Sequence, residues 1–385
     1  MPAIVDRGMN ATLLVMEATR RGLDVAALNI ANQHNDDYIN RELQISSIVA
    51  GSQNMGPGKL RVERFFDQHL DRNIRTQLSK VESASVREKY LQSISDLVAQ
   101  KDNPSTPSKA NETFFNSLRA LSANVTEQAL KNSVVEEGRN VSRVINNIAD
   151  GLYRIRYEAD QEIQETIQTA NLLVQDLFHI NQNLKVSANS AGDVDQLTNR
   201  DLTLKKLSKL LDFETRFDQN GGSILTLRGG LSLLDVDVYS EISYDSQDTV
   251  AAFKDGANIN PIMVTEYSVS GKKLSTHELV TGGINASEIK TDLQFGRLAG
   301  LLEARDHYGQ GEIDIMNNLA VVVSDAVNAI HNKGSGRPPA ESLTGSRPTT
   351  YSSLTAWQGN FKVAVTDVNG IALAATTTEA TCAGY

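Results

Sequence analysis

The sequence predicts a mainly α-helical, elongated protein: a helical bundle with coiled-coil-like character, a small inserted β domain and a β-like C-terminal tail. Three observations support this class. A long stretch from Thr126 to Val186 holds helical apolar spacing without a proline, an Asn-Gly-Gly turn divides two alternating runs near residue 220, and helical spacing returns after residue 296. At 385 residues and 40% hydrophobic content, the chain is long enough for several folded domains.

The first expected helix covers residues 9–34. Its apolar side chains recur every seven residues at Met9, Met16, Leu23 and Ile30, with Leu13 and Ala27 beside them. Such a face suits a partner helix, although an ordinary core helix or a membrane-surface helix shows similar spacing. We rank the membrane-surface alternative last, because the polar face has only the Arg20-Arg21 pair and no aromatic residue precedes Tyr38.

Residues 42–62 contain Gly51, Gly56, Pro57 and Gly58 and are expected to be a looser segment. Helical spacing resumes from Arg64 to Gln100 and ends in a polar cluster with two prolines at 102–108. A short helix is expected from Asn111 to Ala123.

The segment from Thr126 to Val186 predicts one helix of about 60 residues, which would span about 90 Å. A helix of that length must run along partner helices, because it cannot fit inside a compact core. The residues of its apolar seam are Val141, Ile145, Ile148, Leu152, Ile155, Ala159, Ile163, Ile167, Ala170, Val174, Leu177, Ile180 and Leu184.

After a break at 187–192, a helix is expected from Leu197 to Leu211 and then a β-hairpin, Phe213–Phe217 with Ile224–Leu227, around Asn220-Gly221-Gly222. Further short β-like runs are expected at 233–239, 262–269 and 278–284. The domains that we predict are an N-terminal helix and turn (1–62), a long-helix bundle (63–212), a small β domain (213–290), a returning helical segment of the bundle (291–335) and the start of a variable β domain (336–385).

Composition excludes several classes of function. A net charge of -10 and a pI near 5.2 argue against nucleic acid and against an anionic membrane as main partners. The one cysteine, Cys382, rules out an intramolecular disulfide and a multi-cysteine zinc site. We find neither a signal-peptide pattern nor a membrane-spanning apolar run, so no membrane insertion is expected; taken alone, this would favour a cytoplasmic protein.

A search for chemistry finds no catalytic, cofactor-binding or metal-binding motif, and we expect neither an enzyme nor a cofactor. The six scattered histidines are interpreted as surface or packing residues: His34, His69, His179, His277, His307 and His331. The acidic pairs Asp36-Asp37, Glu136-Glu137 and Asp235 with Asp237 are interpreted as solvated surface. Arg297, Glu303, Arg305 and Asp306 have spacings at which opposite charges meet along one helix, and we interpret them as packing and registry groups.

Residues 28–41 carry a more specific signal. Asn29-Ile30-Ala31-Asn32, followed by Tyr38 and Arg41, resembles the N-terminal signature of bacterial flagellar axial proteins, approximately Asn-Asn-Ile-Ala-Asn-x-x-Thr-x-Gly-Tyr. Asn35-Asp36-Asp37 replaces the usual residues before the tyrosine, and these residues also favour turns.

The order of later elements narrows the resemblance to the hook-associated proteins of the hook-filament junction. These elements are the Leu197 to Asp201 segment with its Arg200-Asp201 pair, the Asn-Gly-Gly hairpin, a Gly-x-Leu-x-Gly-Leu-Leu-x-x-Arg-Asp element at 296–306, and Asn328, His331 and Gly334 at the end of a helix. The resemblance covers about residues 9–335.

The resemblance implies a secreted structural subunit that self-polymerises between neighbouring hook and second junction proteins, after export by the flagellar type III apparatus without a cleaved signal peptide. The assembly interface that we predict is Leu13, Met16, Leu23, Ala27, Ile30, Asn32 and Tyr38. Two alternatives remain: another axial subunit (hook, rod or flagellin-like), and a cytoplasmic coiled-coil scaffold with residues 126–186 as its dimer stalk.

The resemblance also implies a C-terminal helix that pairs with the first one, and an export-chaperone site near it. The printed sequence ends at Tyr385 in β-like residues, so we expect an incomplete sequence or a shortened paralogue. We further expect the first helix to become ordered only when neighbouring subunits pack on it.

Overall fold

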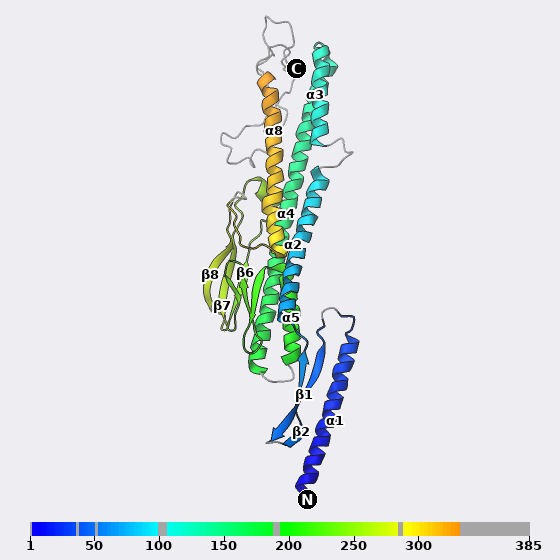
Figure 1. Ribbon diagram of the computed structural model, residues 1–385. Coiled ribbons are helices and arrows are strands. Elements are labelled where there is room, and N and C mark those ends of the chain that lie inside the picture. The colour runs from blue at the N-terminus through cyan, green and yellow to red at the C-terminus, as the bar shows by residue number, and fades with distance from the viewer. Residues whose placement is uncertain are drawn as a thin grey trace.

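In a computed structural model, the chain is an elongated helical bundle with a β-sheet on one side and an N-terminal helix and hairpin at one end (Figure 1). The structure describes residues 2–35, 38–50, 53–98, 106–187, 193–283 and 288–331. The predicted class, mainly helical with a small β domain, is confirmed. The predicted β-like tail at 336–385, Cys382 and the pair Asp36-Asp37 lie outside the described residues.

The N-terminal region is a helix followed by a hairpin. Helix α1 (Pro2–Ala31) packs on strands β1 (Arg41–Ala50) and β2 (Gln53–Arg64), which pair antiparallel. The prediction of a loose segment at 42–62 is therefore wrong. Pro57 is tolerated because it lies opposite Ser47, where the register shifts, and such irregular positions accept residues that a regular ladder excludes.

The bundle consists of α2 (Gln68–Val98), α3 (Pro107–Ala123), α4 (Gln128–Ser187) and α5 (Asp193–Leu210), with later helices packed against them. Two helix starts differ from the prediction because of capping residues. Asp67 accepts hydrogen bonds from the backbone N–H groups of His69 (2.8 Å) and Leu70 (3.1 Å), so α2 begins after it. Thr106 caps α3 in the same way, with Pro107 in the first turn.

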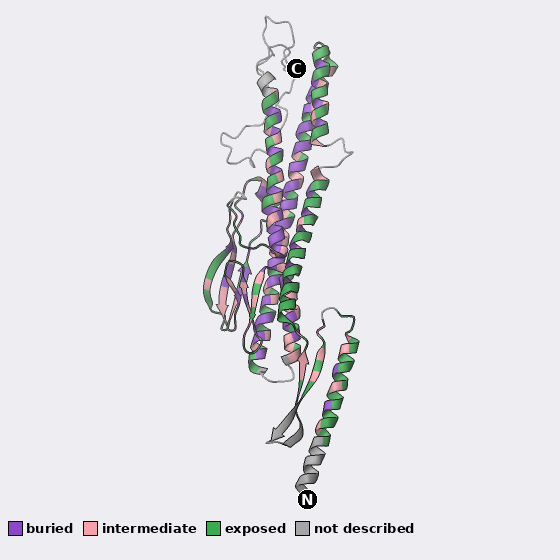
Figure 2. Ribbon diagram, viewed as in Figure 1, coloured by how far each residue is buried: buried purple, intermediate pink, exposed green. Residues whose placement is uncertain are grey.

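Helix α4 is the central element of the fold. Its 60 residues correspond to about 90 Å, and it contacts α2, α3, α5, α7 and α8. All the seam residues predicted for it are buried, apart from the half-buried Ile180 (Figure 2). The prediction that this helix runs along partner helices is confirmed.

The β domain is a six-stranded antiparallel meander in chain order. Its strands are β3 (Phe213–Phe217), β4 (Ser223–Leu227), β5 (Ser232–Leu234), β6 (Val238–Ser243), β7 (Ile262–Ser268) and β8 (Lys273–Val280), with the short helix α6 (Val250–Lys254) between β6 and β7. The predicted first hairpin is confirmed. Gly221 has φ +84°, and the Asp218 carboxylate accepts hydrogen bonds from the N–H groups of Asn220 and Gly222.

Two strand predictions are wrong. The run 233–239 is not one strand, because a tight turn folds β5 onto β6 so that Leu234 pairs with Tyr239. Apolar and polar residues alternate in the same way along one strand and across such a turn, so the sequence pattern does not distinguish the two. The last strand begins at Lys273 and not at Glu278, because it is an edge strand whose exposed, polar first half is defined by pairing with β7. Ile284 lies outside the described residues.

Amide side chains of α4 attach the sheet to the bundle. Asn171 donates to the carbonyl of Ile242 (2.7 Å) and accepts from its N–H (2.9 Å). Asn181 forms the same pair of bonds with Ser223, at 2.8 and 2.7 Å. Each amide therefore satisfies both polar groups of one strand residue, as a neighbouring strand would, and fixes the sheet on α4.

The chain returns to the bundle through α7 (Gly296–Leu302), a π-helix (Glu303–Gly309) and α8 (Gln310–His331). Two glycines of the 296–306 element have a physical role. Gly296 has φ +88°, and a Cβ there would lie 2.7 Å from the carbonyl oxygen of Leu210. A Cβ at Gly300 would lie 2.9 Å from the carbonyl oxygen of Ser83, so this glycine allows α2 and α7 to approach closely.

Candidate assembly surface and the polar clusters that support it

One face of α1 is apolar and uncovered. Leu13, Met16, Leu23 and Ile30 expose 58%, 65%, 67% and 67% of their surface. The opposite face contacts the hairpin through the buried Ala18 and Val25. The structure therefore brings the predicted interface residues of this helix onto one solvent-facing side and leaves them without an intrachain partner among the described residues. We call this face, with the exposed Ala27, the α1 seam.

The residues of the N-terminal signature form a hydrogen-bonded cluster at the end of α1. Asn29 accepts from the Tyr38 hydroxyl (3.0 Å) and from the N–H of Arg41 (3.1 Å), and it donates to the carbonyl of Arg41 (2.9 Å). The Arg41 guanidinium lies 5.7 Å from the centre of the Tyr38 ring and pairs with Asp195 of α5 at 2.7 Å. The signature thus holds the turn between α1 and β1 and ties it to the bundle.

Asn32 and Tyr38 were predicted for the assembly interface, and the structure gives each an intrachain contact. Tyr38 is half-buried against Asn29, and the Asn32 amide donates to the carbonyl of Leu28 at 2.9 Å. Asn29, which was not among the predicted interface residues, makes the largest number of these contacts. An Asn at the end of a helix, nine residues before a Tyr, was the available signal.

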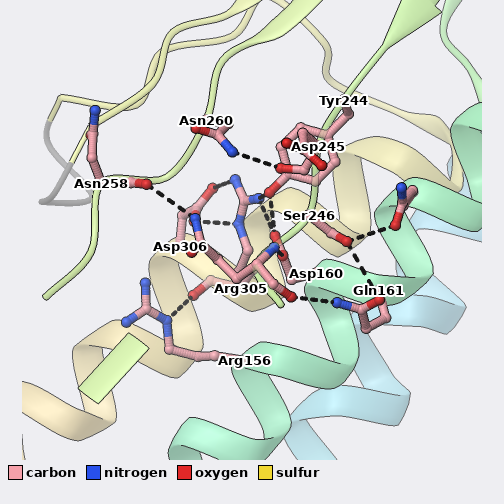
Figure 3. Close-up of polar contacts among 12 residues, drawn as sticks. Arg156, Asp160, Gln161, Tyr244, Asp245, Ser246, Asn258, Asn260, Arg305 and Asp306 are labelled. Carbon is pink, nitrogen blue, oxygen red and sulfur yellow. Dashed lines mark hydrogen bonds and ion pairs between the residues drawn. The ribbon is translucent and has the colours of Figure 1, made fainter. Parts of the chain in front are cut away.

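A buried cluster of charged residues joins the sheet to the bundle (Figure 3). Arg305 donates two hydrogen bonds of 2.7 Å to the Asp306 carboxylate and one each to Asp160 and the Tyr244 hydroxyl, also at 2.7 Å. Tyr244 in turn donates to Asp160, which also accepts from the N–H of Gln247 (2.7 Å). Three elements meet here: α4, the residues after β6, and the π-helix.

Arg156 of α4 completes this cluster. Its Nε donates to the carbonyl of Arg305 (3.0 Å), its Nη1 donates to Gln310, and its guanidinium lies 4.9 Å from the ring centre of Phe253. A Cβ at Gly309 would lie 2.6 Å from Cγ of Arg156, so glycine is required where the π-helix passes this side chain. The π-helix thereby places the Arg305 carbonyl and the Gln310 side chain within reach of α4.

The electrostatics of the cluster follow from burial and pairing. Burial alone would lower the pKa of Arg305, but the charge and hydrogen bonds of Asp306, with Tyr244 and Asp160, outweigh burial and raise that pKa. Burial lowers the pKa of Arg156 and raises the pKa of Tyr244. Because two arginines face two aspartates and the polar atoms are paired, the arrangement is suited to fixing the position of the sheet and not to reacting with a substrate.

A second Arg-Asp pair repeats this design at the other end of the sheet. Arg200 donates from Nε and Nη2 to Asp201 Oδ1 (2.8 and 2.6 Å), and its Nη1 donates to the carbonyl of Gly221 in the β3–β4 turn. Arg64, the last residue of β2, donates to the other oxygen of Asp201 at 2.7 Å. The guanidinium of Arg200 lies 4.1 Å from the ring centre of Phe217. This pair therefore joins the N-terminal hairpin, α5 and the sheet.

The prediction that charges of the 296–306 element meet along one helix is wrong, apart from the adjacent Arg305 and Asp306. Arg297 pairs with Glu162 of α4 (2.8 Å) and Glu82 of α2 (3.4 Å). Glu303 pairs with Arg87 of α2 at 2.6 Å. Ion pairs between helices form in place of pairs within one helix because α7 and the π-helix pack directly on α2 and α4.

The described residues contain no group of three or more His, Cys, Asp or Glu side chains placed to hold a metal ion. Within the same residues, no helix is long and apolar enough to cross a membrane. Glu136, Asp235 and Asp237 are exposed, as expected for solvated surface, and Asp237 pairs with Lys185 at 2.8 Å. His34, His69, His179, His277 and His307 are exposed too.

Comparisons with known proteins agree on one family. Residues 91–340 match the family described as "Flagellar hook-associated protein FlgK helical domain". The chain is 24% identical over 359 residues to flagellar hook-associated protein 1 of Bacillus subtilis (strain 168), covering 85% of this chain and 68% of the relative. It is 22% identical to the Salmonella typhimurium protein of that name, covering 87% of this chain and 57% of the relative.

The fold has a solved counterpart. The flagellar hook junction protein FlgK from Burkholderia pseudomallei aligns with a TM-score of 0.55 and 18% sequence identity, covering 71% of this chain and 47% of that chain. At this identity the likeness concerns the fold. The chain spans just over half the length of the Salmonella relative and about two thirds of the Bacillus one.

Proposed function

The chain belongs to the family of the flagellar hook-associated protein FlgK helical domain, and from this premise we propose that it is a structural subunit of the bacterial flagellum at the hook-filament junction. The family match over residues 91–340 and relatives named flagellar hook-associated protein 1 support this proposal. The chain would act by polymerising, with no reaction to catalyse.

The observation that carries the proposal is the uncovered α1 seam. Leucine, methionine and isoleucine side chains along one face of α1 are more than half exposed, so an isolated chain leaves this apolar surface in contact with water. A partner helix would bury the surface, which is favourable. Seven-residue spacing is the pattern by which helices pack side by side. We propose Leu13, Met16, Leu23, Ala27 and Ile30 as the contact residues, with Asn32 and Tyr38 at the end of the surface.

The two Arg-Asp clusters support a mechanical role for the rest of the chain. Arg200-Asp201 ties the hairpin to α5 and the sheet, and Arg305-Asp306 ties the sheet to α4. The Arg41–Asp195 and Arg64–Asp201 pairs attach α1 and the hairpin to the bundle at defined points. A subunit in a filament junction must transmit force without rearranging, and buried, fully bonded polar clusters resist rearrangement.

Two alternatives follow from the sequence. A cytoplasmic scaffold with α4 as a dimer stalk is disfavoured, because this chain's own helices and sheet cover the α4 seam. Another axial subunit shares the N-terminal signature, and the match to the hook-associated helical domain favours the junction protein over it. Neighbouring hook and second junction proteins, self-polymerisation and the type III export apparatus are the partners we propose.

Complementation tests the proposal. In a strain that lacks its own hook-associated protein 1, we would express the Met16→Glu/Leu23→Glu variant, which places charges on the α1 seam. We expect the purified variant to retain the circular dichroism and melting temperature of the original, while motility and filament attachment are lost.

The control is Leu172→Glu, because Leu172 is a similarly exposed leucine (63%) on α4, away from the seam. Full motility of the double variant would contradict the assignment of the seam. Failure of the unaltered chain to appear in isolated hook-basal bodies would contradict the proposed function itself.

A further inference from the structure

A second feature of the surface lies apart from the α1 seam. Between α2, the end of α5 and strand β3 there is a cavity of about 380 Å³. Four arginines line it, Arg72, Arg75, Arg216 and Arg228, together with Ser79 and Ser208. We call it the arginine pocket.

The pocket is positive in an otherwise acidic chain. Its four arginines face two carboxylates in the lining, Asp212 and Glu214, whereas the whole chain carries a net charge of -10. Arg228 is neutralised by Asp212 at 2.7 Å. In the described part of the chain, no hydrogen bond or ion pair engages the guanidinium groups of Arg72 and Arg216. Two positive side chains at the pocket are thus available to a ligand.

Two lining residues, Ser79 and Arg75, carry buried polar atoms without a hydrogen-bond partner in the described part of the chain. Ser79 is 4% exposed and its hydroxyl oxygen has no hydrogen-bond partner among the described residues. Arg75 is 6% exposed; it donates to the Thr215 hydroxyl (3.0 Å) and pairs with Asp71 (2.9 Å), but its Nε has no partner there. Buried polar groups are normally bonded, and these two unpaired donors belong to residues that line the cavity.

The pKa of Arg75 is consistent with an anion in the pocket. Burial lowers the pKa of its guanidinium, and the opposing charges of Asp71 and Asp201 do not fully compensate. A further negative charge in the pocket would favour the charged guanidinium. Arginine side chains that line one space are the groups that bind carboxylate and phosphate oxygens.

We propose that the arginine pocket is a binding site for an oxyanion, a carboxylate or a phosphate. The ligand oxygens would accept hydrogen bonds from Arg72 and Arg216. Two sources share this chemistry: a free ion, and the carboxylate of an acidic side chain on a second copy of this chain. The acidic surface of the chain favours the second copy.

Isothermal titration calorimetry of the full chain with inorganic phosphate, against sodium chloride of equal ionic strength, tests the site. We expect saturable binding, weakened about tenfold or more in Arg72→Gln/Arg216→Gln because two charge-assisted hydrogen bonds are lost. These two arginines are exposed and have no partner among the residues that the structure describes, so the variant should fold; an unchanged circular dichroism spectrum and melting temperature in sodium chloride would confirm it.

Arg143→Gln/Arg154→Gln is the matched control, since it removes the same charge from exposed positions of α4. This control should bind phosphate like the original chain. The proposal is overturned if the original chain shows no saturable binding, or if the two double variants lose binding equally. This arm does not depend on the proposed junction function, since it requires only the isolated chain.

Sedimentation velocity then distinguishes a free ion from a carboxylate of a second copy as the ligand. This second test rests on the proposed self-assembly. If a second copy supplies the carboxylate, saturating phosphate and the Arg72→Gln/Arg216→Gln change should both weaken association, while sodium chloride of equal ionic strength should not. If association is absent or insensitive to both while calorimetry shows binding, the pocket takes a free oxyanion. Loss of assembly through the α1 seam would leave the calorimetry unchanged, so the two proposals fail separately.

Discussion

Helices α1 and α4 carry the same kind of apolar repeat, and the structure treats them in opposite ways. The α4 seam is buried almost completely, with Leu152, Ala159, Ile163 and Leu177 at 0% exposure. The α1 seam leaves its large side chains 58–67% exposed. The difference is the partner: α4 is surrounded by other helices and a sheet, whereas α1 contacts the hairpin on its opposite face.

A seven-residue repeat therefore marks a surface that needs a partner, but it does not specify whether the partner belongs to the same chain or to another. On α4 the partner is the same chain, so the seam contributes to the stability of the fold. On α1 no described residue covers the seam, so its burial would contribute to association. Changes at the two seams should therefore separate stability from assembly.

The largest effect should come from the charged cluster beside the α4 seam. Asp160→Ala removes the carboxylate that binds Arg305 and Tyr244 and leaves a buried arginine short of a partner. We expect the free energy of unfolding to fall by about 3–5 kcal/mol, measured by urea denaturation. Asp176→Ala, at an exposed position of the same helix, should change it by less than about 0.5 kcal/mol. Equal effects would mean that the cluster does not stabilise the docked sheet.

A leucine pair tests the comparison directly. Leu177→Ala empties a fully buried site on α4 and should cost about 2–5 kcal/mol of unfolding free energy, through lost burial and the cavity left behind. Leu23→Ala, at 67% exposure on α1, should change it by less than about 0.5 kcal/mol. Urea denaturation of the two single variants measures both changes in the free energy of unfolding. A cost at Leu23 similar to that at Leu177 would show that the isolated chain covers the α1 seam.

A smaller, local effect is expected at the turn that follows α1. Asn29→Ala removes the bonds to Tyr38 and to both backbone groups of Arg41, at a net cost of about 1–2 kcal/mol for a half-exposed group. Hydrogen exchange should accelerate in α1 and β1 while α4 keeps its protection. If exchange in α4 rose as well, α1 and the bundle would unfold as one unit, and the contrast between the two regions would be wrong.

The smallest effect concerns the surface charges that attach α4 to α2 and α7. Burial raises the pKa of Glu162, but the hydrogen bond and charge of Lys89 and the charge of Arg297 outweigh burial, so the pKa is lowered from its usual 4.5. A carboxylate with a lowered folded-state pKa stabilises the fold above about pH 4.5, and this contribution is lost as the pH falls through the lowered value.

Glu162→Gln should therefore be less stable than the original at pH 7, by less than about 1 kcal/mol, since exposed ion pairs contribute little. The difference should shrink in acid. Chemical denaturation at pH 7 and pH 3 measures it; a difference that stays constant between these pH values would exclude Glu162 as the titrating group. Glu158→Gln, at an exposed position of α4 one helical turn earlier, is the control.

Much of the secondary structure could be predicted because local chemistry specifies it. Spacing of three and four residues without proline predicted α4 to within two residues at its start, and the Asn-Gly-Gly turn predicted the β3–β4 hairpin. The hairpin at 41–64 and strand β8 were missed or shortened, because their pairing depends on a partner strand and not on their own hydrophobicity. The apolar side of α1 was also visible from the repeat alone.

What the sequence by itself determined is which faces are apolar and which short motifs turn the chain, because these depend on residues close together in sequence. Only the tertiary structure decided which faces are covered and which charges meet. Arg305 finds Asp160 and Arg64 finds Asp201 across separations of more than a hundred residues, and the arginine pocket draws on α2, α5 and β3. Such contacts depend on how the elements pack around α4, and periodicity along the chain carries no information about that packing.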